Sequence, residues 1–465
     1  MTDVSKHLAD VLSSTRYADL PAQTVVDAKR AVLDWLGSAL AGALEPPARM
    51  AQQVVAGLGT SDEATVFAAG GSSAAGAALA NGVASHILEL DDVHKGSTIH
   101  AAAPVIPAAL AVAEREHLSG RDFLLAVTLG YDAAFRVGEA VNPSHYRFFH
   151  PTGTAATFGA AVAAGSLLGL DAKQMLDALG SAGTQAAGLW EFNADGTMSK
   201  HLHPGKAAFN GVLSADLAKA GFTGAGKILE GNRGFFRAMS ASFDPSRVTD
   251  GLGQRWKVSE NCYKVWSCCG HTHTAVDVAA DISSERWAGE PRAHDVASIS
   301  IETYGPGYEI VKEPNPRSTY EAKFSIAYCV AAALLYAGAP LEAFSDDHFR
   351  PDGVTDRDLV ALLERTTVTV APDLTAKYPG AWPTRIRVTF TDGTEINRAS
   401  DFPLGNPENP VSTSYLEEKF RALVLPGWGD AVATRAIDAL HSLESCVDMS
   451  MAFSEFAADP VPVEE

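Results

Sequence analysis

The sequence predicts a mainly α-helical protein: a large all-helical domain, residues 1–266 and 401–465, and a smaller α+β domain, residues 267–400. Three observations lead to this fold class. Apolar residues recur at spacings of three and four over much of the first half, alternate with polar residues in two later stretches, and return to helical spacing near the C-terminus. We therefore expect the two ends of the chain to pack together.

The first predicted domain is rich in alanine and glycine. Small residues on several helices let the helix axes approach closely, so we expect a tightly packed bundle. One apolar stripe at helical spacing consists of Val25, Ala28, Val32, Trp35, Leu36 and Ala39.

The second predicted domain begins with a strand at residues 296–304. Strict alternation puts Val296, Ser298 and Ser300 on one face and Ala297, Ile299 and Ile301 on the other. A hairpin follows at residues 384–398, turning at Asp392-Gly393. Helical spacing predicts helices over the following segments: 321–338, 356–366, 414–424 and 433–445.

The bulk composition excludes several classes of partner. A formal net charge of −20 argues against nucleic acid and against an anionic membrane, since both require a positive protein surface. No apolar run reaches the roughly 18 residues that span a bilayer, and the N-terminus lacks the apolar core of a signal peptide, so we expect a cytoplasmic protein. The odd number of cysteines, five, favours reduced thiols.

Chemically capable residues gather in four polar segments, each directly before an alanine- or glycine-rich helical run, in residues 91–114, 145–165, 198–221 and 260–282. A helix start offers unpaired N–H groups and a positive dipole end, which favour anions. Helix capping explains each segment taken singly, but their shared composition favours a pocket for a small polyanion. Its predicted lining is His100, His150, Lys200, His203 and Lys264.

Metal and nucleotide motifs are missing from these segments. The clusters DDVH, HLH and CCGHTH contain zinc-type ligands but lack the paired spacing of zinc fingers, and no HExxH is present, so we predict no bound metal. The stretch GFTGAGKI, residues 221–228, follows a helix and lacks the Ser or Thr of a phosphate loop, so a turn is favoured.

The four segments, in this order, resemble the MmgE/PrpD family over nearly the whole chain. The matching stretches include LELDDVH, FHPTGTAATFGAAVAAG, MSKHLHPGKAAFNG and YKVWSCCGHTHTAVD. The resemblance implies a helical domain made from both chain ends, an α+β lid domain and a homodimer. It also implies proton transfer at a carbon next to carboxylates, without metal or organic cofactor, as in 2-methylcitrate dehydration, cis-aconitate decarboxylation and iminodisuccinate epimerisation.

The residue-level match to these subgroups is uneven. His100, His150, Lys200 and Lys264 stand where the decarboxylase-like members keep their site histidines and lysines. Three positions depart from that subgroup: Glu89 replaces an aspartate, Val93 a threonine and Ile310 a lid tyrosine. The epimerase-like pattern of a tyrosine before HPTG and a lysine in the fourth segment is met by Tyr146 and Lys264.

The hypothetical mechanism that follows assigns Lys264 as the base, kept neutral by burial and nearby cations, and Tyr146 as the residue that returns a proton. His100 and His203 would donate to the enolate-like transition state. The remaining predicted substrate-binding residues are His150, Thr152, Gly153, Lys200, Glu89, Asp91 and Asp92. We expect at least one of the two aspartates to orient a site histidine or lysine from behind.

Dehydration of a small di- or tricarboxylate is the leading expectation, taken from the family as a whole. Epimerisation or isomerisation of an iminodisuccinate- or aconitate-like acid is the first alternative, cis-aconitate-type decarboxylation the second. A non-catalytic protein that binds carboxylates is the alternative from a different class.

Overall fold

The computed structural model describes residues 3–460 and divides the chain into two units. One unit comprises Met1–Asn261 and Ser412–Glu465, and the other comprises Cys262–Val411. The first is dominated by helices and the second combines helices with a sheet, so the predicted fold class is confirmed. We call them the helical unit and the α+β unit, and describe each by itself.

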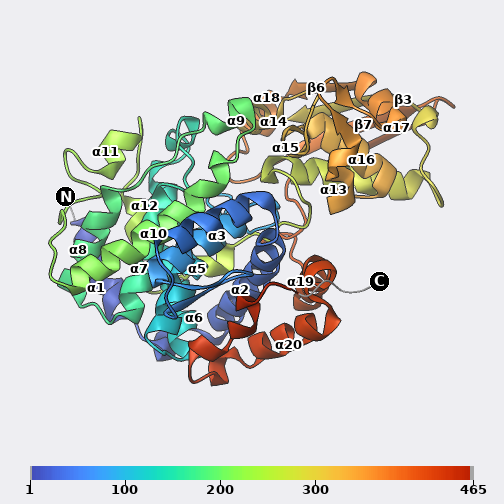
Figure 1. Ribbon diagram of the computed structural model, residues 1–465. Helices are drawn as coiled ribbons and strands as arrows, with labels where there is room; N and C mark the ends of the chain where they lie inside the picture. The colour runs from blue at the N-terminus through green and yellow to red at the C-terminus, as the bar shows by residue number, and fades with distance from the viewer. Residues whose placement is uncertain (1–2, 461–465) are drawn as a thin grey trace. The chain divides into compact units, whose positions relative to one another are not determined.

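The helical unit is built around α2, α4, α5, α6, α7 and α10 (Figure 1). Its longer helices are α1 (Val4–Ser14), α2 (Ala22–Gly42), α3 (Pro46–Leu58), α4 (Ala74–Ala84), α5 (Ala102–Arg115), α6 (Gly120–Val141), α7 (Ala155–Leu167), α8 (Ala172–Gly183), α10 (Ser199–Lys219), α19 (Thr413–Trp428) and α20 (Asp430–His441). Its short ones are α9 (Phe192–Asp195), α11 (Phe235–Met239) and α12 (Ser246–Thr249).

Close helix crossings in this unit depend on glycine. A Cβ on Gly159 of α7 would lie 2.5 Å from the carbonyl oxygen of Gly130 on α6, and one on Gly82 of α4 would lie 2.8 Å from Cα of Gly205 on α10. The predicted stripe on α2 is buried throughout, with Trp35 among the largest fully buried side chains. Small residues therefore set the helix spacing, as the composition indicated.

The two ends of the chain meet on α2. In Figure 1 the C-terminal helices α19 and α20, in red, lie beside α2, in blue, and α19 packs extensively against α2. The Trp428 indole donates to the carbonyl of Leu40 over 3.2 Å, and the Lys419 ammonium lies 2.6 Å from the Asp34 carboxylate. These contacts confirm that the helical unit is built from both chain ends.

A short hairpin, β1 (Ala64–Val66) and β2 (Gly70–Ser72), also belongs to the helical unit. Asn81 of α4 supports it by accepting from the Phe67 amide and donating to the Thr65 carbonyl. Strands of three residues that contain glycine have no usable alternation, so the sequence pattern did not indicate them.

The α+β unit contains a four-stranded sheet of order β6-β3-β7-β8. Its strands are β3 (Val296–Thr303), β6 (Thr366–Val370), β7 (Thr384–Phe390) and β8 (Glu395–Ser400), and the unit also carries a small hairpin of β4 (Phe349–Arg350) and β5 (Gly353–Val354). Strand β6 pairs parallel to β3, whereas β7 pairs antiparallel to β3 and β8. The predicted strand and hairpin are confirmed.

Strand β3 departs from strict alternation at its start. A register shift between Val296 and Ser298 turns Val296 toward the buried side that Ile299 and Ile301 occupy. A β-bulge of this kind inserts one residue and so reverses the facing of what precedes it. The sequence expectation, which put Val296 on the opposite face from Ile299, is wrong at this residue.

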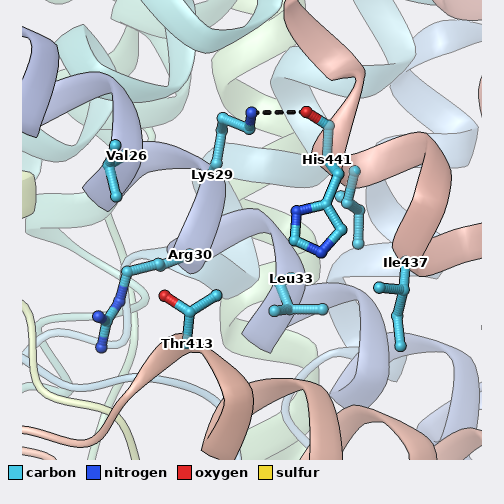
Figure 2. Close-up of a pocket in the computed structure, with 8 residues that line it drawn as sticks. Val26, Lys29, Arg30, Leu33, Thr413, Ile437 and His441 are labelled. Carbon is cyan, nitrogen blue, oxygen red and sulfur yellow. Dashed lines mark hydrogen bonds between the residues drawn. The ribbon is translucent and has the colours of Figure 1, made fainter.

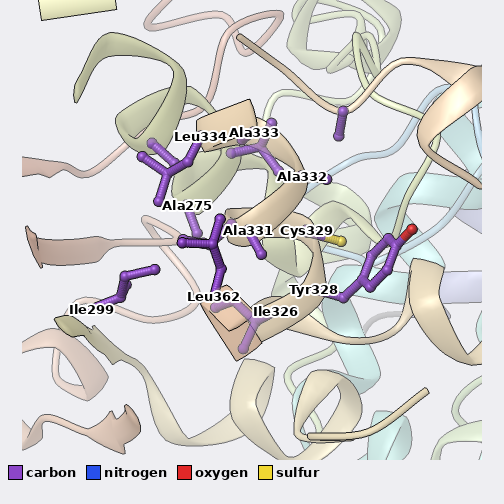
Figure 3. Close-up of a cluster of buried hydrophobic side chains, with 14 of the residues drawn as sticks. Ala275, Ile299, Ile326, Tyr328, Cys329, Ala331, Ala332, Ala333, Leu334 and Leu362 are labelled. Atoms are coloured by element: carbon purple, nitrogen blue, oxygen red, sulfur yellow. The ribbon is translucent and has the colours of Figure 1, made fainter. Parts of the chain in front are cut away.

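Helices cover the sheet and complete the core of the α+β unit. They are α13 (Gly270–Arg286), α14 (Gly305–Val311), α15 (Thr319–Lys323), α16 (Ile326–Tyr336), α17 (Arg357–Glu364) and α18 (Pro372–Thr375). Figure 3 shows alanines and Leu334 of α16 among Ala275 of α13, Ile299 of β3 and Leu362 of α17. The helix predicted over 321–338 is broken, because Ser325 caps a new helix by accepting from the Tyr328 amide.

Two further expectations can be compared with the described part of the chain. No helix within residues 3–460 is long and apolar enough to cross a bilayer. The cysteines, all of which fall in that range, carry free thiols. The segment 221–228 follows the end of α10 as turns and coil, as predicted.

Candidate active site

Three of the four polar segments converge inside the helical unit, each bringing a histidine to one cluster. His100 lies just before α5, His150 lies before α7, and His203 lies on α10. The ring centroids of His100 and His150 are 6.2 Å apart, and those of His150 and His203 are 5.3 Å apart. Helix starts distant in sequence therefore supply one constellation of side chains.

The third segment sits differently from the prediction. Helix α10 begins at Ser199, so Lys200 and His203 are in its first turns and not ahead of it. Proline usually occupies the first position of a helix, but Pro204 lies inside α10. The helix therefore begins earlier than the sequence indicated. Both side chains therefore project from a regular helix.

His86 occupies the centre of the cluster, and the sequence analysis did not select it. Its ring centroid is 4.8 Å from that of His100, 5.6 Å from that of His150 and 6.4 Å from that of His201. The residue follows the end of α4 and is fully buried. The sequence did place His86 five residues before Asp91, a possible partner. In the structure Oδ2 of Asp91 lies 2.6 Å from Nδ1 of His86.

The adjacent residues Asp91 and Asp92 make different contacts. The Asp91 carboxylate lies 2.6 Å from Nδ1 of His86 and 3.5 Å from Nδ1 of His100, so it is placed to orient both rings. The Asp92 carboxylate accepts from the Ala102 amide at the start of α5 and from the Tyr131 hydroxyl. Burial raises the pKa of Asp92 to about 7. Capping therefore accounts for the Asp92 side chain.

The backbone of Asp92 also positions His100. Its carbonyl oxygen lies 2.6 Å from Nδ1 of His100. A carbonyl can only accept, so this nitrogen carries the proton, and in the neutral ring the Nε2 atom holds the lone pair. Nε2 is therefore the atom of His100 at which a proton can be gained or lost.

Lys200 is paired with a carboxylate of the protein itself. Its ammonium forms an ion pair with Glu89, and both side chains are almost fully buried. Glu89 has a φ of +58°, a conformation that costs energy for a residue with a side chain. A strained backbone therefore holds this carboxylate against Lys200.

Thr152 and Gly153 shape the same region. The Thr152 hydroxyl accepts from the His100 amide over 3.1 Å. A Cβ on Gly153 would lie 2.8 Å from the Ala187 carbonyl oxygen and 3.0 Å from Cβ of His203. These two residues hold His100 and His203 in place, which is a positioning role beyond the substrate contact that the sequence predicted.

Aromatic side chains connect Tyr146 with the histidines. The Tyr146 ring packs edge-on against Trp190 at 5.0 Å, and Trp190 in turn lies 5.1 Å from the His150 ring. Phe192 packs 5.4 Å from His203. Sequence reasoning missed Trp190 and Phe192, because no periodic pattern surrounds them.

Burial keeps the imidazoles neutral. Burial, followed by the charges of His203 and His86, holds the pKa of His150 well below its ordinary value. Burial, with Lys206 and Lys200, lowers the pKa of His203 to about 4. At neutral pH the two rings offer hydrogen bonds and lone pairs, and do not supply the positive charge expected of a polyanion pocket.

The fourth polar segment belongs to the α+β unit, and its Lys264 is buried there. In the same unit Nδ1 of His271 lies 2.5 Å from the Tyr304 hydroxyl. Burial, then the charge of Lys264, lowers the pKa of His271 to about 3. The role predicted for Lys264 stays a prediction.

Two groups within residues 3–460 have side chains placed to hold a metal ion. One is His86, His100 and His150, and the other is His94, Glu139 and Glu260. In the second group the Lys257 ammonium lies 2.9 Å from both carboxylates and already neutralises them.

The helical unit also contains a largely apolar pocket of about 200 Å³ (Figure 2). It is lined by Val26, Lys29, Arg30, Leu33, Thr413, Ile437, Leu440 and His441. The Lys29 ammonium donates to the His441 carbonyl over 2.8 Å. None of the predicted site residues is in this lining, so we do not assign the chemistry to this pocket.

Comparison with known proteins covers almost the whole chain. Residues 6–248 match the model of the MmgE/PrpD N-terminal domain, and residues 266–444 match that of the MmgE/PrpD C-terminal domain. The chain is 27% identical over 474 residues to a cis-aconitate decarboxylase-like protein, oryM, of Aspergillus oryzae, covering 96% of each chain. It is 27% identical over 472 residues to cis-aconitate decarboxylase of Aspergillus terreus, covering 96% of this chain and 94% of the relative. The human cis-aconitate decarboxylase is 28% identical over 461 residues, covering 96% of this chain and 93% of the relative.

Proposed function

Because the chain belongs to the MmgE/PrpD family, we propose that it is a cofactor-free lyase that dehydrates a small di- or tricarboxylate. The observation that carries this proposal is the cluster of His86, His100, His150 and His203, in which His86 and His150 are buried and the charge of Lys200 acts on His150 and His203. Such a cluster can bind carboxylates and move protons in a site that excludes water.

The proposed reaction is an elimination. A base removes the proton from the carbon next to a carboxylate, the C–O bond of the neighbouring carbon breaks, a C=C bond forms, and the departing hydroxide takes a proton and leaves as water. Lys264 is the proposed base, and the enolate-like charge requires preorganised donors.

His100 is the proposed proton carrier for the leaving group. It must bring a proton on Nε2, and the Asp91 carboxylate lies 3.5 Å from its Nδ1. Tyr146, which the sequence suggested for this role, is the alternative acid; its ring contacts Trp190, which in turn contacts His150.

When substrate binds, a substrate carboxylate is proposed to replace the Glu89 carboxylate at Lys200. An arriving substrate carboxylate competes with Glu89 for the ammonium. His150 and His203 add hydrogen bonds on one side.

We also propose that the protein is a homodimer. Light scattering of the purified protein measures its molar mass and so tests this.

Decarboxylation is the second candidate, favoured by the names of the relatives reported above. It would use the same carboxylate contacts, with CO2 leaving and a proton delivered to carbon. Glu89, Val93 and Ile310 depart from the decarboxylase-like pattern, so dehydration stays first. Epimerisation is the third candidate, through Tyr146 and Lys264.

The deciding experiment incubates the protein in D2O with citrate-, aconitate- and aspartate-derived acids and follows them by NMR. Dehydration produces a new vinyl signal, decarboxylation produces CO2, and epimerisation incorporates deuterium with inversion. Line broadening alone would identify a non-catalytic binder and overturn the proposal.

Matched variants separate catalysis from binding. Lys264→Ala is expected to abolish exchange of the substrate C–H for deuterium, whereas His7→Gln, which changes an exposed imidazole on α1, should leave it unchanged. Full exchange in Lys264→Ala would remove that residue as the base.

A further inference from the structure

Three histidines meet at the centre of the helical unit, and they come from separate parts of its fold. Each of His86, His100 and His150 offers one ring nitrogen, and the three nitrogens lie within 4.8 Å of one another. His86 follows α4, His100 precedes α5 and His150 precedes α7. Ligands spaced in this way form no local motif, so a search for zinc-type spacing could not find them.

Each of the three rings has a partner at its Nδ1 atom. The partners are the Asp91 carboxylate at 2.6 Å for His86, the Asp92 carbonyl at 2.6 Å for His100, and Nδ1 of His203 at 3.0 Å for His150. A carboxylate or carbonyl behind an imidazole is the arrangement that metal-ligating histidines commonly show, since it fixes the tautomer and the ring orientation.

These partners determine which nitrogen can bind a cation. The Asp91 and Asp92 oxygens accept, so Nδ1 carries the proton in His86 and His100, and Nε2 carries the lone pair of the neutral rings. In His150 the same tautomer results when its Nδ1–H donates to His203.

The surrounding charges suit a cation. Glu89 and Asp91 bring two carboxylates, and Lys200 is the ammonium paired with Glu89. By contrast, the Lys257 ammonium already lies between the carboxylates of the other candidate group, His94, Glu139 and Glu260. The three-histidine group is therefore the better site of the two.

We propose that His86, His100 and His150 bind a divalent transition-metal cation of the zinc type, and that the bound cation blocks the proposed reaction. Zinc–nitrogen distances of about 2.1 Å in a tetrahedron bring ligand nitrogens to roughly 3.4 Å of one another, so the rings must close in slightly. A fourth position stays open for water or a substrate carboxylate. The binding is independent of the proposed function, whereas the inhibition rests on it.

The binding test titrates the chelator-treated, desalted protein with Zn2+ by calorimetry and with Co2+ by visible absorption, which reports tetrahedral ligation. One ion per chain is expected. His86→Gln should weaken binding more than Asp91→Asn, and removing an outer partner such as Asp91 costs about 10- to 100-fold. His94→Gln and His7→Gln should bind as the parent does.

Several results would overturn this site: no binding at millimolar Zn2+, unchanged binding in His86→Gln, or loss of binding in His94→Gln. Because His86 is fully buried, His100→Gln, at a more exposed position, provides a second variant. Thermal unfolding of each variant confirms that it is folded.

The inhibition is measured separately. The D2O experiment with a chelator present tests the proposed function alone, and added Zn2+ should then stop turnover, with chelator restoring it. A protein that binds zinc but never turns over refutes the function and keeps the site. A protein that turns over only with zinc refutes the inhibition.

Discussion

The Glu89 carboxylate forms a buried ion pair with the Lys200 ammonium across 111 positions of sequence. Glu89 belongs to the loop after α4 and Lys200 to the first turn of α10, two helices that pack closely together. Lys200 is a proposed substrate contact, so in this proposal Glu89 competes with a substrate carboxylate for the ammonium.

Replacing Glu89 with glutamine tests whether the Glu89 carboxylate competes with a substrate carboxylate for Lys200. We expect KM to fall, because the substrate no longer competes with an internal carboxylate, and the free energy of unfolding to fall by about 3–5 kcal/mol, because the ammonium stays buried without its counter-charge. Steady-state kinetics and urea unfolding measure the two effects. The double variant Glu89→Gln/Lys200→Met should recover stability but not activity, and a raised KM in Glu89→Gln would contradict the competition.

Proton uptake should accompany substrate binding. Burial and neighbouring cations lower the pKa of His203 to about 4, and a polycarboxylate beside it would raise that pKa. Binding therefore weakens as the pH rises through the pKa of the bound state. Calorimetry in two buffers of different ionisation enthalpy gives the number of protons, which His203→Gln should reduce. Equal heats in both buffers would rule out the uptake.

Stability should respond to pH through Glu114, a buried carboxylate that accepts from the Thr65 amide. Burial raises its pKa to about 7, so the folded state holds a proton that the unfolded state releases near pH 4.5. Its contribution is full below about pH 4.5 and is lost as the pH rises to about 7.

The comparison with Glu114→Gln isolates this contribution. The parent's free energy of unfolding should decline relative to the variant's by about 3 kcal/mol over that window, at 1.36 kcal/mol per pKa unit. Urea unfolding at several pH values measures it. A difference that stays constant with pH would show that Glu114 does not titrate abnormally.

Gly153 offers a steric test of the site. A methyl group there would meet the Ala187 carbonyl oxygen at 2.8 Å and His203 at 3.0 Å. Gly153→Ala should cost about 1–3 kcal/mol of stability by overpacking, and should raise KM by displacing His203. Gly57→Ala on α3 is the matched control, since nothing lies within 4 Å, and it should stabilise the protein by up to about 1 kcal/mol.

The spacing of apolar residues predicted those helices and strands in which buried residues recur at a regular interval. The stripe on α2 and the alternation of Ile386, Val388 and Phe390 on β7 were both readable, because one face of each element is buried. Strand β6 was not, because it lies at the sheet edge and its TTVTV sequence is only partly buried. Its position is set by pairing with β3, a distant segment.

The candidate site was readable only in part. Polar residues near predicted helix starts included His100, His150, Lys200 and His203. They could be selected because the N-terminus of a helix carries a partial positive charge that favours anions. This selection could not find His86 or Trp190, since packing between distant helices alone brings them to the cluster. It also predicted positive charge where burial makes the imidazoles of His150 and His203 neutral, and burial is a property of the fold.

Two variants decide which residue supplies the proton to the leaving group. His100 has its Nδ1 fixed by the Asp92 carbonyl and a carboxylate nearby, so His100→Gln should lower kcat by roughly 10²–10⁴-fold, the usual worth of a positioned acid. Tyr146→Phe should lower kcat by less than about 10-fold if His100 is the acid, because the Tyr146 ring, which packs against Trp190, then has no proton to deliver. Single-turnover rates at saturating substrate measure both, and His7→Gln gives the baseline. The opposite ranking, with Tyr146→Phe inactive and His100→Gln active, would transfer the proton to Tyr146 and favour an epimerase over a dehydratase.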